Sequence, residues 1–218
     1  MRLVDLSHTV SDGLITYPGL PAPTISEHLT FEASHAVYDE GTEFSIGRIE
    51  MVSNTGTYLD TPGHRHRGRH DLSGLPLEKC VLLPAVVVDA PATGAAELSL
   101  FEGLDVSGCA VLVRTGWSSR FGTEEYGDGE HPFLATDAAS WLADSGVVLV
   151  GIDSVNIDDT RGGRREVHTL LLDREVPVVE HLTGLDELPA SGATFSAVPP
   201  KVAGMSTFPV RAFATLPN

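Results

Sequence analysis

The sequence predicts a single α/β domain that is rich in strands and has a few helices. Residues 82–89, 109–114 and 147–153 are dense in Val, Leu and Ala, a composition typical of strands covered on both faces. Between the second and third of these runs, residues 136–145 place Ala, Trp and Leu at helical spacing and are followed by a glycine. A strand–helix–strand unit is therefore expected over 109–153, and the chain has no internal repeat or low-complexity linker.

The N-terminal part of the chain predicts short strands joined by loops. Residues 2–6 are expected to form a strand, followed by a loop that contains Tyr17-Pro-Gly-Leu-Pro21. The stretch 22–40 is polar and expected to be irregular, whereas residues 43–52 alternate in the manner of a strand. A further strand is expected over 50–60, where a following proline ends it.

The rest of the chain adds shorter elements of both kinds. Their apolar patterns predict a short helix or turn at 96–101, a helix at 168–173, a turn or short helix at 182–188, and strands at 176–180, 198–202 and 210–214. Strands outnumber helices, so residues 1–218 are expected to form one mixed domain.

The charge of the chain excludes one class of partner. The formal net charge is −16, and nucleic-acid affinity depends on clustered Lys and Arg, so no nucleic-acid partner is expected. One short segment is locally basic, because Arg65, Arg67 and Arg69 alternate with histidines. A loop with that pattern could receive a small anion.

The remaining composition indicates a cytoplasmic protein. The N-terminus has no extended apolar run, so no signal peptide is expected, and the apolar stretches are too short to span a membrane. Cys80 and Cys109 are expected to be buried free thiols and not a disulfide.

The first candidate for a functional site is the segment 50–60 with the turn that follows. In a strand, the period of two places Asn54, Tyr58 and Asp60 on one face, and His64 lies just beyond it. These residues alone leave two interpretations open. The face is either catalytic, or a polar surface in solvent with Asp60 starting a turn.

A second cluster adds residues that could bind a metal ion. Glu180 ends an apolar strand, where an unpaired carboxylate would be costly, and His168 precedes an apolar segment. Together with Asp60 they supply the ligand types of a Zn²⁺ or Mn²⁺ site with open positions. The three lie on different elements, so their closeness in space is an expectation.

These residues resemble the putative cyclase family, which includes bacterial kynurenine formamidase and isatin hydrolase. The family fingerprint is His-x-Gly-Thr-His-x-Asp-x-Pro-x-His, and here it reads Asn54-Thr-Gly-Thr-Tyr-Leu-Asp-Thr-Pro-Gly-His64. Further matches run along nearly the whole chain in the family's order, at Asp5-Leu-Ser, Tyr17-Pro-Gly19, Leu75-Pro-Leu, Arg114-Thr-Gly-Trp117, Gly151-Ile-Asp153, His168 to Glu180, and Thr207-Phe-Pro-Val-Arg211.

The resemblance implies a fold, an activity and site residues. The fold would be the family's swivelling β/β/α type, and the activity a divalent-metal hydrolase that opens an amide-type bond of a small molecule. Asp60 and Glu180 match metal-binding carboxylates, and His168 matches a metal-binding imidazole. His64 matches the residue that acts as general base and acid. Tyr17 matches an aromatic position of the substrate pocket.

Two departures from the fingerprint limit what the resemblance implies. The family's first two metal-binding histidines are replaced by Asn54 and Tyr58, and an amide or a neutral phenol binds Zn²⁺ much less well than imidazole. We therefore expect one divalent ion, Zn²⁺ or Mn²⁺, with the second metal site lost. Asn54 and Tyr58 would then contact the substrate.

Alternatives to this hydrolase remain open at the level of sequence. One is a metal-free or metal-altered cyclase or lyase that uses His64 with Asp60 or Glu180. Another is a family member that binds a small molecule without turnover. The resemblance also implies a homodimer or larger homo-oligomer, for which residues 20–45 would suit an arm over the neighbouring copy.

Several other residues are expected to have structural roles. Arg114, Asp153 and Asp158 are interpreted as structural. The remaining histidines are expected to be surface or ordinarily hydrogen-bonded groups, and this set comprises His8, His28, His35, His66, His70, His131 and His181.

Overall fold

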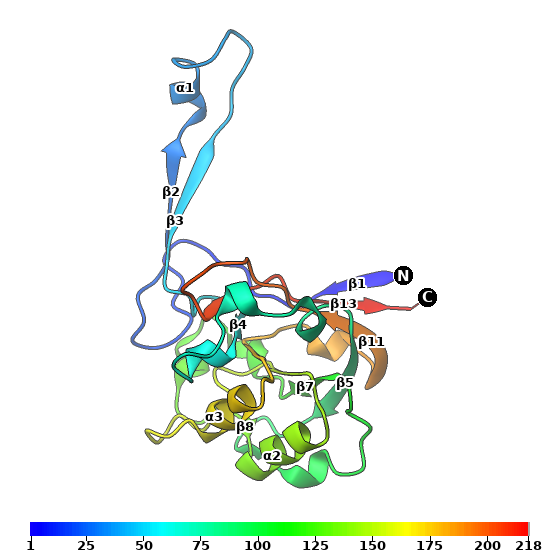
Figure 1. Cartoon of the computed structure of the whole chain (residues 1–218). Helices are drawn as coiled ribbons and strands as arrows, with labels where there is room; N and C mark the ends of the chain where they lie inside the picture. Colours follow the sequence, from blue (N-terminus) through cyan, green and yellow to red (C-terminus); the bar gives the residue numbers. More distant parts are fainter. Residues whose placement is uncertain (218) are drawn as a thin grey trace.

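A computed structural model describes residues 1–217 of the chain, which form a curled mixed sheet with a few helices and one long projecting hairpin (Figure 1). The three α-helices are α1 Phe31–Ser34, α2 Thr136–Asp144 and α3 Glu166–Asp173. The strands are β1 Arg2–Asp5, β2 Thr24–Leu29, β3 Ile46–Glu50, β4 Tyr58–Asp60, β5 Leu83–Asp89, β6 Ala95–Ala96, β7 Ala110–Arg114, β8 Phe133–Leu134, β9 Leu149–Ile152, β10 Val178–Glu180, β11 Ser191–Ser196, β12 Thr207–Pro209 and β13 Phe213–Leu216.

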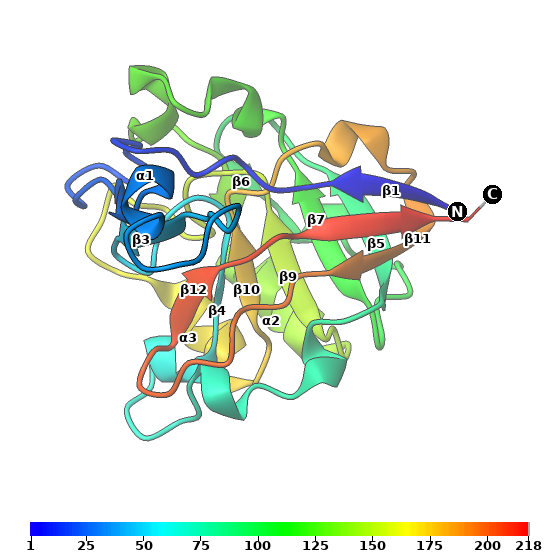
Figure 2. The same cartoon turned by 90° about the horizontal axis from the view of Figure 1, so that it is seen from above.

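Nine strands form the main sheet, in the order β1-β13-β11-β5-β7-β9-β10-β4-β12. The four central strands from β5 to β10 are parallel, and the flanking strands are antiparallel. Only residues 210–212 link β12, at one edge, to β13, which is next to the other edge. Seven strand spacings in a flat sheet would cover about 34 Å, whereas such a link reaches only about 14 Å. The sheet must therefore curl until its two ends approach each other, as Figure 2 shows.

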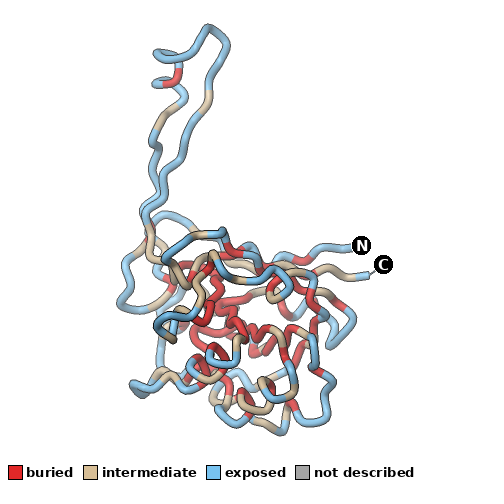
Figure 3. The backbone as a smooth tube through the Cα atoms, viewed as in Figure 1, coloured by how far each residue is buried: buried red, intermediate tan, exposed pale blue. Residues whose placement is uncertain are grey.

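The two faces of the sheet pack against different cores, because successive side chains of a strand point in opposite directions. Leu112 of β7 and Leu59 of β4 belong to the core inside the curl. Val111 of β7 and Val178 of β10 pack on the other face, against α2 and α3. The buried backbone concentrates in these layers (Figure 3). The predicted strand-rich mixed α/β domain is confirmed.

The predicted strand–helix–strand unit over 109–153 is also confirmed, since β7 and β9 are parallel neighbours joined through α2. The helix expected at 168–173 begins two residues earlier, at Glu166. The strand expected over 50–60 is largely wrong, because only Tyr58–Asp60 is extended in the sheet. Gly56 has a φ of +65°, and the hydroxyl of Thr55 donates to the carbonyl of Val52, so this segment forms a loop.

Three further expectations for strands and loops were wrong in whole or in part. Residues 198–202 do not form a strand, because Pro199-Pro200 removes backbone donors; the strands there are β11 and β12 instead. The expected strand at 210–214 begins only at Phe213. The stretch 22–40, expected to be irregular, contains β2 and α1. It lacks the apolar alternation of a half-buried strand because both faces of β2 are exposed.

The β2–β3 hairpin extends away from the rest of the molecule (Figure 1). Its exposed side chains include Ile25, Ile46 and Ile49. The use of this segment as an oligomerisation arm stays a prediction, as does the cytoplasmic location. Among the helices of residues 1–217, none is long and apolar enough to cross a membrane.

Candidate metal centre

Three of the residues selected from the sequence converge where β4, β10 and α3 meet. In the antiparallel pairing of β4 with β10, Tyr58 lies opposite Glu180 and Asp60 lies opposite Val178. These side chains share the face that packs against α3, since cross-strand partners and residues two apart point the same way. His168 comes to the same place from α3.

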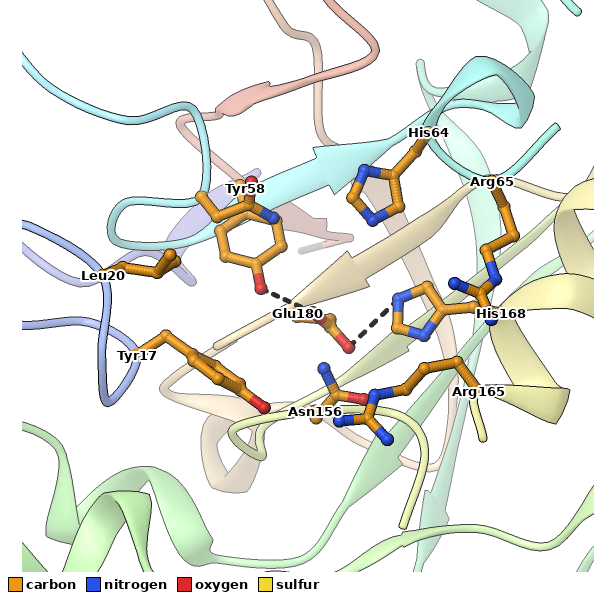
Figure 4. Close-up of a pocket in the computed structure, with 10 residues that line it drawn as sticks. Tyr17, Leu20, Tyr58, His64, Arg65, Asn156, Arg165, His168 and Glu180 are labelled. Carbon is orange, nitrogen blue, oxygen red and sulfur yellow. Dashed lines mark hydrogen bonds and ion pairs between the residues drawn. The ribbon is translucent and has the colours of Figure 1, made fainter. Parts of the chain in front are cut away.

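Asp60, His168 and Glu180 form a compact cluster of potential ligands. Nε2 of His168 lies 3.5 Å from Oδ2 of Asp60 and 3.4 Å from Oε1 of Glu180. Each residue offers one ligand atom, and the three atoms all lie within 4.8 Å of one another. All three residues are buried, with exposed fractions of 0%, 4% and 1%. Figure 4 shows His168 and Glu180 facing each other across the pocket.

The ring of His168 is held from behind by Asp158. Oδ2 of Asp158 lies 2.6 Å from Nδ1 of His168, and Oδ1 accepts the backbone N–H of Val167 at 2.7 Å. A proton on Nδ1 satisfies the Asp158 carboxylate, so Nε2 is the nitrogen left to bind a metal ion. Sequence reasoning had assigned Asp158 a purely structural part, and this contact gives it a positioning role.

The charges of the cluster are strongly interdependent. Burial opposes a charged imidazole, but the carboxylates of Glu180, Asp158 and Asp60 outweigh burial and raise the pKa of His168 to about 10. Burial raises the pKa of Glu180 above its usual range. For Asp60, burial also favours the neutral form, yet His64 and His168 prevail and its pKa is lowered.

The residues present fit a divalent cation. Among buried side-chain atoms of residues 1–217, Oδ2 of Asp60 is one of two without a hydrogen-bond partner, and it points at His168. A buried carboxylate oxygen is costly to leave unpaired. Two carboxylates and one imidazole are a donor set suited to Zn²⁺ or Mn²⁺, with further positions left open for water or substrate.

His64 lies beside the cluster on the turn after β4. The hydroxyl of Thr207 donates its single hydrogen to Oδ1 of Asp60. The hydroxyl oxygen Oγ1 of Thr207 also lies 2.9 Å from Nδ1 of His64. The hydroxyl oxygen of Thr207 must therefore accept a hydrogen bond from Nδ1–H, and in the neutral ring this tautomer leaves Nε2 of His64 as the nitrogen with a free lone pair. The side chain of His64 is 35% exposed and lines the pocket, so its free nitrogen can exchange protons there.

Tyr58 is bound to the cluster by its phenol. Its hydroxyl donates to Oε2 of Glu180 at 2.6 Å, and Nε2 of His181 lies 3.3 Å away. Burial and the adjacent Glu180 carboxylate raise the pKa of Tyr58 well above its usual value, so the phenol stays neutral and acts as a donor. His181 in turn contacts the hydroxyl of Tyr126 at 2.8 Å, in keeping with its expected ordinary hydrogen-bonded role.

A pocket of about 210 Å³ opens over the cluster. Its lining contains His64, His168, Glu180 and the three expected substrate-binding residues, which are Tyr17, Asn54 and Tyr58. Of the other lining residues, sequence reasoning missed Leu20, Asn156 and Arg165, whereas Arg65 belongs to the basic segment that could receive a small anion. The arginine–histidine alternation after His64 was the available signal for Arg65. His66, by contrast, contacts the carbonyl of Thr169 and is not part of this lining.

Comparisons with known proteins extend over nearly the whole chain. A family model described as "Putative cyclase" matches residues 4–159. The chain is 29% identical over 216 residues to a kynurenine formamidase of Salinibacter ruber, covering 97% of this chain and 96% of the relative. It is also 29% identical over 205 residues to a kynurenine formamidase of Erythrobacter litoralis, covering 92% and 88%.

Solved structures give the same picture. An isatin hydrolase bound to the product analogue thioisatinate matches with a TM-score of 0.85 and 22% identity, covering all of this chain and 93% of that one. Isatin hydrolase A from Ralstonia solanacearum matches with a TM-score of 0.83 and 26% identity, covering 99% and 92%. The first likeness, at 22% identity, shows the fold alone. The second shows the same fold in a protein that is 26% identical in sequence.

Proposed function

Because the chain belongs to the putative cyclase family, we propose that it is a hydrolase of carbon–nitrogen bonds other than peptide bonds. It would open a small amide, lactam or N-formyl substrate with the help of one divalent metal ion. The relatives named kynurenine formamidase and isatin hydrolase support this reaction class. The observation that carries the proposal is the buried convergence of Asp60, His168 and Glu180 around an unpartnered carboxylate oxygen.

In this proposal Asp60, His168 and Glu180 hold the ion, which is Zn²⁺ or Mn²⁺. When bound, such an ion lowers the pKa of water and polarises a carbonyl group. The protein's contribution is to fix the ligands. Asp158 orients His168, and the hydroxyls of Thr207 and Tyr58 each occupy one carboxylate oxygen, on Asp60 and Glu180 respectively.

His64 serves as the general base and then as the general acid. Its Nε2 is free to take a proton from a water molecule in the pocket and to return it to the leaving nitrogen. Thr207 and Asp60 keep the ring in this tautomer. Tyr17, Asn54 and Tyr58 contact the substrate, and Figure 4 shows Tyr17 and Tyr58 on the side of the pocket opposite His64.

One ion is proposed, because Asn54 and Tyr58 occupy the positions of two metal-binding histidines in the family fingerprint. The neutral phenol of Tyr58 already donates to Oε2 of Glu180, so that oxygen is engaged in a hydrogen bond. Asn54 offers only an amide. The hydrogen bond of Tyr58 and the weak ligand at Asn54 both support the loss of the second metal site.

The test combines metal analysis with hydrolysis. Protein purified without chelator should contain about one Zn or Mn per chain, and it should hydrolyse N-formylkynurenine or isatin. The variant His64→Ala should keep its metal and lose activity by about 10²–10⁴-fold. A wild-type protein that lacks metal after growth with Zn²⁺ and Mn²⁺ would refute the metal-dependent mechanism, and a fully active His64→Ala would remove the base.

One observation favours a second candidate, a cyclase or lyase without metal. Nε2 of His168 lies 3.5 Å from Oδ2 of Asp60 and 3.4 Å from Oε1 of Glu180, so a protonated imidazole could by itself balance part of the charge of the two carboxylates. His64 and a carboxylate would then act as the acid–base pair. Activity that survives complete removal of metal by chelation would select this candidate.

A further inference from the structure

The arginines of this acidic chain are paired with carboxylates almost throughout. Nine of them have a carboxylate oxygen within 4.0 Å, and these are Arg2, Arg48, Arg69, Arg114, Arg120, Arg161, Arg164, Arg174 and Arg211. Within the described residues, Arg65, Arg67 and Arg165 have no such partner. Two of these three line the pocket over the metal centre.

Arg65 and Arg165 are held in place by neutral groups. Nε of Arg65 donates to the hydroxyl of Thr169 at 2.9 Å. Nη1 of Arg165 donates to the carbonyls of Gly162 at 2.9 Å and Arg164 at 2.7 Å. These contacts fix both side chains without neutralising their charge, and Figure 4 shows both beside His168.

Binding of a divalent cation would make the net charge of the pocket more positive. A divalent cation held by Asp60 and Glu180 would cancel the two carboxylate charges. With the carboxylate of Asp158 behind His168 still ionised, the two arginines would then exceed the remaining negative charge by one, in a protein whose formal charge is −16. An anion entering from solvent meets repulsion from most of the surface and attraction at this place. Guanidinium groups also match the planar, two-oxygen geometry of a carboxylate.

We propose that Arg65 and Arg165 form an anion subsite, and that the substrate carries a carboxylate beside the amide-type bond that is hydrolysed. This inference rests on the proposed function for the identity of the reacting bond. It does not need that function for the anion binding itself, because two charged and positioned guanidinium groups bind a carboxylate whether or not the bond is cleaved.

The first test compares substrates that differ in one charge. N-formylanthranilate carries a carboxylate next to its formamide, whereas formanilide lacks it. The wild type should favour N-formylanthranilate in kcat/KM by about tenfold or more. Arg65→Gln and Arg165→Gln should each reduce this preference, mainly by raising KM for N-formylanthranilate more than KM for formanilide.

Arg67→Gln is the matched control. Arg67 also has no carboxylate partner among the described residues and lies in the same loop as Arg65, but it does not line the pocket. Its substitution changes the net charge of the protein by the same amount as Arg65→Gln or Arg165→Gln. This variant should keep the wild-type preference. Arg165→Lys retains the charge and should recover part of the preference, and thermal unfolding checks that each variant is folded.

The second test separates this inference from the proposed function. Binding of benzoate and of benzamide is measured by calorimetry on metal-loaded and chelator-treated protein. Weaker benzoate binding in Arg65→Gln and Arg165→Gln, with benzamide binding unaffected, supports the subsite even if no amide is hydrolysed. Equal benzoate affinity in the wild type and both variants overturns the subsite, even if hydrolysis is observed.

Discussion

Two sets of buried carboxylates lie in neighbouring parts of the sheet and differ in what surrounds their oxygens. Asp153 follows β9, and its Oδ1 accepts the N–H of Thr115 at 2.7 Å and the hydroxyl of Thr115 at 2.6 Å. Its Oδ2 accepts the N–H of Gly116 at 2.8 Å. Asp60 on β4 has a hydrogen-bond donor for Oδ1 only, and its Oδ2 faces His168 at 3.5 Å.

The difference teaches how a structural carboxylate can be distinguished from a candidate ligand. Asp153 has both oxygens bonded by fixed donors from one loop, so it stabilises the turn after β7. Asp60 uses Oδ1 to hold the hydroxyl of Thr207 and directs the unpaired Oδ2 toward His168. Glu180 accepts the hydroxyl of Tyr58 on Oε2 and the backbone N–H of Ile157 on Oε1, and Oε1 also lies 3.4 Å from Nε2 of His168. Burial is the same in both sets, so the directions of the oxygens carry the information.

The largest effect is expected from Asp60→Asn. The amide can still accept the hydroxyl of Thr207, but it removes the negative charge that the cation needs. We expect loss of the bound metal and a decrease in kcat/KM on the order of 10³-fold or more, since the metal supplies several kcal/mol of transition-state stabilisation. Elemental analysis and steady-state kinetics measure both. Full metal occupancy in this variant would contradict the assignment of Asp60 as a ligand.

The fold was predictable from sequence where a strand is buried on both faces and its residues are therefore nearly all apolar. The runs that became β5, β7 and β9 are apolar because both of their faces are covered, and they were correctly predicted as strands. The loop before β4 was not correctly predicted, because hydroxyl groups in it make hydrogen bonds in place of the backbone hydrogen bonds between strands. The side chain of Thr57 donates to the carbonyl of His181 at 2.5 Å, a contact between residues 124 positions apart.

The candidate site was predictable only in part, for a similar reason. Asp60, His168 and Glu180 could be selected by residue type and by the family fingerprint, and the structure brings them together. Thr207 and Asp158 were missed as positioning residues. Their parts depend on single contacts made by tertiary packing, and a threonine 147 positions from Asp60 carries no local signal.

Asp158→Asn tests whether the carboxylate behind His168 belongs with the ligand set. The amide would lose the charge-assisted bond to Nδ1 and could hold the ring in the wrong tautomer. Metal affinity should fall by about 10–100-fold, as for other residues that orient a metal-binding histidine. Competition with a chelator of known affinity measures this. An unchanged affinity would return Asp158 to a purely structural role.

Asp153→Asn tests the other side of the comparison. The amide must turn an N–H toward a group that is itself a donor, which leaves a buried mismatch worth about 1–3 kcal/mol. The free energy of unfolding should fall by this amount, which corresponds to about 3 °C in Tm per kcal/mol for a chain of this size. Metal content should stay at the wild-type level. Loss of metal with unchanged stability would show that the two sets of carboxylates are not distinct.

The smallest effect is expected from Tyr58→Phe, which removes the donor on Oε2 of Glu180 and the longer contact of the same hydroxyl with Nε2 of His181. A net hydrogen bond contributes about 0.5–1.5 kcal/mol, so metal affinity should fall by about three- to tenfold. Losing this donor also raises the pKa of Glu180 further, because the hydroxyl favours the ionised form and burial opposes it. The loss should therefore be greater at pH 6 than at pH 8, which chelator competition at both values would show.

Tyr58→His is the informative companion to this variant. It restores the imidazole of the family fingerprint beside a Glu180 oxygen that has been released, so the metal content should rise from one toward two per chain. A rise in Tyr58→His but not in Tyr58→Phe would mean that the imidazole itself recruits the second ion. A stoichiometry of one in both variants would mean that Asn54 also blocks it, since the released carboxylate oxygen would then be insufficient without a second nitrogen ligand.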